Sequence, residues 1–460
     1  MFLYIVIFFI AICLYISAPY DAESSISAIC AVLFTVEAFY TLRDDFKRKE
    51  YLSFNMIFLL SFFLCTFAFP VFVYGTDAQI TSSLSSAVIN FDYLPRTSAM
   101  GLAAISVYMF AYKIIGRKIR KNFKVGNTLI SYIWLSKKID VFTSLAFLAL
   151  LSQVLTHRAS GGGIAVQGNT YVQSIFEVLI ALSLYCKTMS ANVISILDFI
   201  KVNKLTLIEI AIIIIFFLIT GDRGVVITCG LIILFVYSEC VKSIKLGVLL
   251  LFILAGTVGM FIIRITRVNP DASLSAGDMV AFAEVVSSNM DLSLSSFMVI
   301  FSDLTERVEE FCLGLQYVDR SGLYRPFQQL VLTPFYPFPL VPSTLSELLF
   351  NQPLYSFNTG IALNNFVGGA NFGNHCVGDI YMKWGWIGIV MSFYLFGIVM
   401  SLIVNNSKKN IYYSLLYITM MSYALYIPRD QLFATMRPMA YTVFFVWLFI
   451  SIKCLKVRYE

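Results

Sequence analysis

Charged residues are scarce in this sequence. Asp, Glu, Lys and Arg together make up 13% of the 460 residues, whereas hydrophobic residues make up 59%. A water-soluble fold of this length cannot bury that much apolar surface, but a lipid bilayer accepts it directly. The composition therefore excludes a soluble globular protein. It predicts an all-α polytopic membrane protein, with residues 1–460 forming a single membrane-embedded unit.

Signatures of the common cofactor-dependent and hydrolytic sites are also missing. The sequence has two histidines and no Cys/His cluster at metal-ligand spacing. It has no Walker loop, no His-Glu-x-x-His and no Gly-x-Ser-x-Gly elbow. We therefore expect no metal, no cofactor and no nucleic-acid partner. Paired broken helices with charges inside the membrane, typical of ion-coupled transporters, are missing as well.

The nine cysteines do not form the pattern of a disulfide scaffold. Seven of them fall in or beside apolar runs, where cysteine behaves as a small hydrophobic residue. Cys312 and Cys376 lie elsewhere, in a long polar segment. Sequence spacing cannot establish disulfide geometry, so a bridge between these two remains open at this point.

Apolar runs of membrane-spanning length recur along the chain. We interpret the first as a retained span, because no basic segment precedes it and no clear cleavage site follows it. We see no repeat of fixed period and no low-complexity segment. The twelve predicted spans are 2–18, 25–42, 52–74, 98–115, 139–156, 174–196, 205–220, 224–239, 246–264, 380–404, 411–427 and 439–455.

The basic residues indicate how the spans are oriented. When the loops are assigned alternately to the two sides, one side holds 22 of the 33 Lys and Arg residues. The positive-inside bias makes that side cytoplasmic and places both termini in the cytoplasm.

One long loop between spans 9 and 10 interrupts the apolar pattern. It covers residues 265–379, and we expect it to lie at the outer face and to carry the active site. Residues 281–313 follow a helical pattern, with Glu306, Glu309 and Glu310 predicted on a solvated face. The stretch from Pro326 to Pro342 is apolar and rich in proline, which predicts a non-helical interfacial or re-entrant segment.

Arginine dominates the basic residues of the predicted outer face. Ten of the eleven are Arg, whereas 17 of the 22 on the cytoplasmic side are Lys. Arg presents a planar fork of donors that matches carboxylate and phosphate groups, so the bias favours an anionic substrate. Lipid-headgroup contact and structural Arg–Asp pairing are the alternatives for any single residue. The candidates for substrate binding are Arg158, Arg264, Arg267 and Arg429.

Arg223 is a candidate catalytic residue. It lies in Thr-Gly-Asp-Arg-Gly, between two apolar runs with almost no loop. A charge so close to the hydrocarbon costs free energy, so it usually has an ion-pair partner or a functional role. The alternative is a tight turn in which Asp222 neutralises Arg223.

His375 and Asp379 are the remaining catalytic candidates. A neutral imidazole at the outer surface can accept a proton from a hydroxyl, and Asp379, four residues later, would orient the ring if the segment is helical. The alternative is an ordinary polar surface histidine.

At these positions the chain resembles the bacterial oligosaccharide repeat-unit polymerases, which build O-antigen and related surface polysaccharides. The similar residues are Thr-Gly-Asp-Arg-Gly, Pro-Leu-Val-Pro-Ser followed by Asn-Gln-Pro, and Asn-His-Cys-Val-Gly-Asp-Ile-Tyr-Met-Lys-Trp-Gly-Trp-Ile-Gly. The number of spans, the cytoplasmic termini and the dominant outer loop agree with this architecture, which the O-antigen ligases share. Residues Arg223, Arg264 or Arg267, and His375 fall at matching places.

The resemblance implies a location in the bacterial inner membrane and a metal-independent, inverting glycosyl transfer. The donor would be a glycan on undecaprenyl pyrophosphate, and the acceptor a lipid-linked repeat unit. A membrane protein that regulates chain length is a candidate partner. Two alternatives stay open: an O-antigen ligase, and, from a different class, a lipid-linked oligosaccharide flippase.

Overall fold

The computed structural model describes most of the chain. The described residues are 2–48, 50–74, 89–122, 132–159, 169–220, 223–245, 247–249, 251, 256, 305, 307–336, 338, 341–368, 373–408, 410–433 and 436–459. Within them all regular structure is helical and no strand occurs. The all-α prediction is therefore confirmed for this part of the chain.

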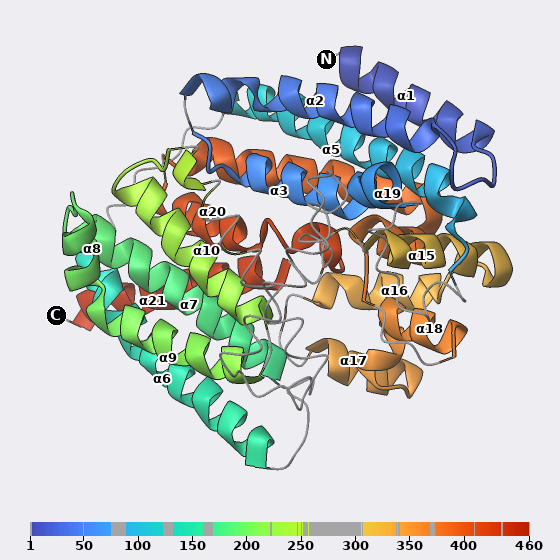
Figure 1. Ribbon diagram of the computed structural model, residues 1–460. Helices are drawn as coiled ribbons and strands as arrows, with labels where there is room; N and C mark the ends of the chain where they lie inside the picture. Colours follow the sequence, from blue (N-terminus) through green and yellow to red (C-terminus); the bar gives the residue numbers. More distant parts are fainter. Residues whose placement is uncertain are drawn as a thin grey trace, which may run out of the picture.

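The N-terminal helices form one bundle together with a helix from late in the chain (Figure 1). Their apolar faces share one core, which contains Phe58, Tyr108 and Phe396. Polar groups inside this core are paired across helices: Ser106 Oγ donates to Glu37 Oε2 at 2.7 Å. Such hydrogen bonds stabilise helix association in a bilayer, because the hydrophobic effect contributes little when the surrounding lipid is itself apolar. The elements are α1 (Phe2–Ser17), α2 (Ile26–Arg48), α3 (Phe54–Phe63), η1 (Leu64–Val73), α5 (Leu94–Asn122) and α19 (Cys376–Asn406).

A second bundle is built from the middle of the chain and its C-terminal helix (Figure 1). Its separate core contains Phe176, Ile213 and Phe449. The elements are α6 (Tyr132–Ala159), α7 (Asn169–Ser190), α8 (Ile196–Val202), α9 (Lys204–Thr220), α10 (Arg223–Cys240) and α21 (Arg437–Tyr459).

Helix α20 (Ile411–Tyr423) lies between the two bundles. Tyr417 and Met420 belong to the first core, whereas Leu415 and Ile418 belong to the second. Opposite faces of one helix therefore join both cores. The short η5 (Ile427–Arg429) that follows α20 packs against α3 and α19 of the first bundle.

Shorter helices from the predicted loop gather beside the first turns of α19 (Figure 1). The predicted non-helical stretch 326–342 is wrong for most of its length, since it contains a helix and a 3-10 turn and begins another helix. Pro326, Pro334 and Pro342 all fall in first turns, where a missing N–H costs nothing. The elements are α15 (Arg307–Ser321), α16 (Pro326–Leu332), η3 (Thr333–Phe335), α17 (Val341–Phe350), η4 (Leu354–Phe357) and α18 (Thr359–Phe366).

Two further expectations about the loop are corrected. Glu309 and Glu310, predicted on a solvated face, are buried at 7% and 6% exposure, because α15 packs against α19 and η1. Glu306 lies outside the described residues. Cys312 and Cys376 are both buried as free thiols, so they form no bridge.

The predicted spans agree only partly with the helices. Among the described residues, five helices are long and apolar enough to cross a membrane: Ile26–Arg48, Phe54–Val73, Phe91–Ile114, Tyr171–Ser190 and Cys376–Asn406. Phe2–Ser17, Gly224–Cys240 and Arg437–Ser451 are apolar but shorter. Most of the predicted run 246–264 lies outside the described residues.

Helix α19 starts four residues before the predicted span and contains a break. Gly385, with φ +61° and ψ −152°, adopts a conformation that other residues rarely enter. The backbone N–H of Tyr324 donates to the carbonyl of Met382 at 2.7 Å, just before the break. The break separates a short first segment, residues 376–384, which carries the charged Asp379 and Lys383, from the long remainder of α19.

Candidate functional site

Several candidate residues come together at one end of the bundles. His375 and Asp379 lie at the start of α19, and Arg429 lies on η5. Arg264 and Arg267 are outside the described residues. Arg158 lies near the end of α6 and Arg223 begins α10, but their side chains are outside the described part.

His375 is the N-cap of α19 and is 1% exposed. Its Nδ1 accepts a hydrogen bond from the backbone N–H of Val377 at 3.3 Å, and its Nε2 lies 3.1 Å from Oγ1 of Thr66. The ring stacks on Phe311, with centroids 4.5 Å apart and an interplanar angle of 9°. Since both nitrogens are engaged by other groups, Asp379 does not orient this ring as the sequence pattern suggested.

The surroundings of His375 keep it neutral. Burial, together with the nearby Arg307 guanidinium, lowers the pKa of its imidazole to about 3. Because Nδ1 accepts the Val377 N–H, the proton of the neutral ring belongs on Nε2, facing the Thr66 hydroxyl. This ring caps α19 and aligns it with η1, a π-helical segment that bears Thr66.

Asp379 forms a buried ion pair with Lys383, one helical turn later. Lys383 Nζ lies 2.8 Å from Oδ1, and the two side chains are 1% and 0% exposed. Thr359 Oγ1 donates to the same Oδ1 at 2.5 Å. A buried ion pair with further hydrogen bonds is satisfied and rigid, so it fixes α18 against the first segment of α19.

Arg307 and Glu310 make a second ion pair on α15. Arg307 Nη1 lies 2.5 Å from Glu310 Oε1, and the backbone N–H of Gly373 donates to the same oxygen at 3.1 Å. Burial raises the pKa of Glu310, although Arg307 and the Gly373 N–H oppose the shift. A Cβ on residue 373 would lie 2.5 Å from Arg307 Nη1, so a larger residue there would displace the guanidinium from its place beside Glu310.

Asp430 differs from these paired acids because it is accessible to solvent. Although the residue as a whole is exposed, neighbouring groups desolvate its carboxyl and so raise the carboxyl pKa, and Asp379 raises it further. The backbone N–H of Gln431, which donates to Asp430 Oδ1 at 2.7 Å, acts in the opposite direction, as do the positive charges of Arg437 and Arg429. The next residue, Gln431, donates to Asn358 Oδ1 at 3.1 Å and ties the loop to α18.

The two arginines beside Asp430 rest on aromatic rings. The Arg429 guanidinium carbon lies 5.4 Å from the centroid of Tyr426, and that of Arg437 lies 5.0 Å from Tyr171. Arg437 Nε also donates to the carbonyl of Tyr336 at 3.3 Å. A guanidinium group that lies over an aromatic ring keeps many of its N–H donors available for an anion.

The start of α10 adjoins this group. The hydroxyl of Tyr426 donates to the carbonyl of Gly224 at 3.0 Å. The N-terminus of α10, where residue 223 lies, is therefore close in space to the segment that carries Arg429.

Sequence reasoning missed several of these residues. Lys383 is the single lysine among the eleven basic residues of the predicted outer face, and its i, i+4 spacing from Asp379 is a signal for the pair. Thr359 and Gln431 carry no local signal, because their roles depend on contacts distant in sequence. Asp430 directly follows Arg429, so its place in the sequence suggests only an ion pair with that neighbour.

The group combines an accessible carboxylate, guanidinium cations and a rigid polar frame. It suits proton removal from a hydroxyl beside a bound anion. Among the described residues, no group of three or more His, Cys, Asp or Glu side chains is arranged to hold a metal ion.

Comparison with known families gives one match. The family model of the O-antigen polysaccharide polymerase Wzy matches residues 1–458. No curated protein and no solved structure matches the chain. The family match covers essentially the whole sequence and is consistent with the apolar helices described above. The chain therefore belongs to the O-antigen polysaccharide polymerase Wzy family.

Proposed function

We propose that this protein extends an O-antigen at the periplasmic face of the bacterial inner membrane. It would transfer a growing glycan from undecaprenyl pyrophosphate to the terminal sugar of a lipid-linked repeat unit. Family membership supports the reaction class. The observation that most directly supports the residue assignment is the accessible Asp430 carboxylate between Arg429 and Arg437.

The chemistry proposed is a single displacement. The acceptor hydroxyl oxygen attacks the anomeric carbon, the bond from that carbon to the pyrophosphate oxygen breaks, and the configuration inverts. Asp430 takes the hydroxyl proton, and its raised pKa makes it a stronger base than an ordinary aspartate. The departing pyrophosphate keeps the bonding electrons and is stabilised by Arg429 and Arg437.

The remaining candidates support this centre in the proposal. Arg223, Arg264, Arg267 and Arg158 would contribute further cationic contacts to the pyrophosphate or to an acidic sugar. His375 and the Asp379–Lys383 pair would position α19 against α18 and η1, because both are buried and fully engaged. The transfer is proposed to need no metal, since guanidinium groups supply the positive charge.

Surface polysaccharide from a deletion strain tests the proposal. Without a polymerase the lipopolysaccharide should consist of core plus a single repeat unit, and the intact chain should restore the ladder of longer species. Bare core in the deletion strain would indicate a ligase instead. Accumulation of lipid-linked units on the cytoplasmic side would indicate a flippase.

A further inference from the structure

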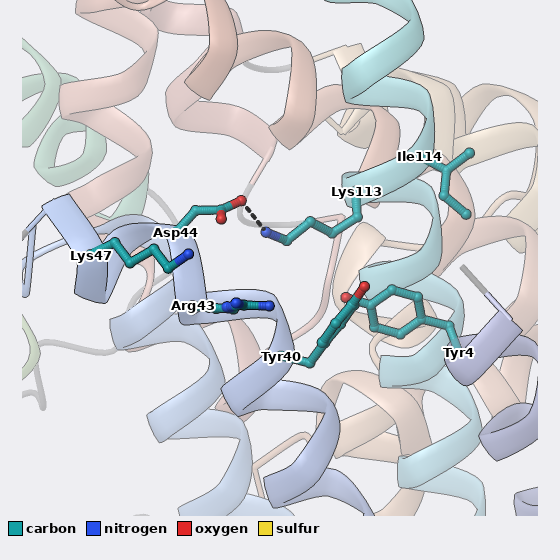
Figure 2. A pocket seen from close by; sticks show the side chains of 7 residues that line it. All are labelled: Tyr4, Tyr40, Arg43, Asp44, Lys47, Lys113 and Ile114. Atoms are coloured by element: carbon teal, nitrogen blue, oxygen red, sulfur yellow. Dashed lines mark hydrogen bonds and ion pairs between the residues drawn. The ribbon is translucent and has the colours of Figure 1, made fainter.

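A polar cavity lies between α1, the C-terminal part of α2 and α5. It has a volume of about 280 Å³ and is lined by Tyr4, Tyr40, Arg43, Asp44, Lys47, Lys113 and Ile114 (Figure 2). This volume is near the lower limit of small-molecule pockets, about 300 Å³. The cavity therefore suits a ligand the size of a lipid headgroup.

The cavity carries an excess of positive charge. In Figure 2 the side chains of Arg43 and Lys47 from α2 and of Lys113 from α5 extend toward the same space. Asp44 is the single carboxylate in the lining, and it pairs with Lys113 at 3.0 Å. Three cations thus face one carboxylate, which leaves two positive charges uncompensated within the lining.

Neighbouring carboxylates are engaged outside the cavity. Asp45 pairs with Arg48 at 2.8 Å, and Glu50 pairs with Lys408 at 2.9 Å. Among the described residues, neither Arg43 nor Lys47 forms a hydrogen bond or an ion pair, and both are exposed. Their donors are therefore available to an anion.

The position of the cavity relates it to the membrane. Lys113 lies 17 residues after Arg96 on α5, which corresponds to about 26 Å along a helix, close to the thickness of the hydrocarbon core of a bilayer. The cavity is then at one headgroup level, while η2 (Phe91–Tyr93), which directly precedes α5, lies at the other end of that helix.

Apolar surface continues from the cavity along the two outer helices. On α2, Phe39 is 67% exposed and Val32 63% exposed, and on α1 Phe2 is 80% exposed. Tyr40, at the rim, is 42% exposed and packs edge-to-face on Tyr4 at 5.8 Å. A ligand with a phosphate group and acyl chains satisfies both the charged cavity and this adjoining apolar surface.

We propose that this cavity binds the phosphate of an anionic phospholipid, with the acyl chains lying along α1 and α2. Arg43 and Lys47 contact the phosphate, and Lys113 adds charge from the opposite wall. Tyr40 covers the boundary between headgroup and chains, where amphipathic rings are favoured. The inference is independent of the proposed reaction, because none of these residues belongs to the site around Asp430.

The test measures lipid binding by native mass spectrometry of the full chain in detergent. The probes are phosphatidylglycerol, phosphatidylcholine and inorganic phosphate. The test variant is Arg43→Gln/Lys47→Gln. The matched control is Lys201→Gln/Lys204→Gln, which removes two exposed cations outside the cavity. A swap, Arg43→Lys/Lys47→Arg, keeps both charges and checks that the fold tolerates substitution.

The wild type, the control and the swap should bind phosphatidylglycerol alike. The test variant should bind it roughly 30-fold more weakly, since each cation near an anionic lipid contributes about a factor of five. Phosphatidylcholine should bind weakly to all four proteins. Equal phosphatidylglycerol binding by the test variant and the control would overturn the proposal. Displacement of phosphatidylglycerol by millimolar inorganic phosphate would overturn its lipid part.

Discussion

Lys383 and Asp379 form an ion pair inside the first segment of α19, with Nζ 2.8 Å from Oδ1 and both side chains shielded from solvent. Two charges so close to a membrane are tolerated because each satisfies the other and Thr359 completes the bonding. The pair therefore makes the segment before Gly385 a fixed part of the fold.

Lys383→Met should destabilise the protein by about 3–5 kcal/mol, because it leaves the Asp379 carboxylate buried without a cation. The double variant Asp379→Asn/Lys383→Met should recover most of this loss. Thermal unfolding in detergent for both single variants and the double gives the coupling free energy. A coupling below about 1 kcal/mol, the value for exposed pairs, would contradict the described pair.

His375→Asn should make stability less sensitive to acid. The asparagine still caps α19, but it does not titrate. Below about pH 6.5 an unfolded histidine binds a proton, whereas the folded His375, with a pKa of about 3, does not. The wild type should therefore lose up to about 1.4 kcal/mol per pH unit relative to the variant as pH falls from 6.5 towards 3.

The measurement is the thermal unfolding temperature of both proteins between pH 7.5 and about 4.5. Parallel curves would show that His375 is not buried in its neutral form. The same variant should keep polymerase activity at neutral pH. If His375→Asn instead lost activity at a normal protein level, His375 would be the better candidate for the catalytic base.

Arg223→Lys should insert normally but lose much of its activity, because an ammonium group cannot make the bidentate contact of a guanidinium. Arg223→Ala should lose more, about 2–4 kcal/mol of transition-state stabilisation. Polysaccharide ladders normalised to membrane-inserted protein measure both. Asp222→Ala is the control and should lower protein level more than specific activity. Wild-type ladders from Arg223→Lys would exclude the substrate role.

The two ends of α5 should be reached from opposite sides of the membrane. A cysteine replacing Asp319, which accepts a hydrogen bond from Tyr93 at one end, should react with a membrane-impermeant thiol reagent from the periplasm. A cysteine replacing Ser343 on α17 should behave in the same way. A cysteine replacing Lys47, at the other end, should react only after the inner membrane is permeabilised. The reverse pattern would invert the orientation.

The helical class and the neighbourhood of the site were predictable because they depend on local patterns. Apolar runs predict helices such as α3 and α19, and the polar residues around His375 mark a place where such a run begins. The burial of Glu310 was not predictable, since it depends on α15 packing against α19 and on the N–H of Gly373, both remote in sequence. The helices after Pro326 and Pro342 were missed because proline was read as a breaker, whereas both residues lie in first turns.

Asp430 shows why the site itself needed the structure. Its neighbours Arg429 and Arg437 are visible in the sequence, but its accessibility and its proximity to Asp379 arise from the meeting of α19, α20 and α21. Local sequence gives no measure of either property.

Reconstitution of the full chain in lipid vesicles with an undecaprenyl-pyrophosphate-linked repeat unit tests whether Asp430 acts as the base of glycan elongation. The measurement is the length of the lipid-linked glycans. We expect dimers and longer chains from the wild type and from Asp319→Asn, an equivalent change at an exposed carboxylate outside the site. We expect Asp430→Asn to lose at least about a hundredfold in elongation rate, typical of removing a general base. Unchanged elongation by Asp430→Asn, or no elongation by the wild type, would contradict the proposed function.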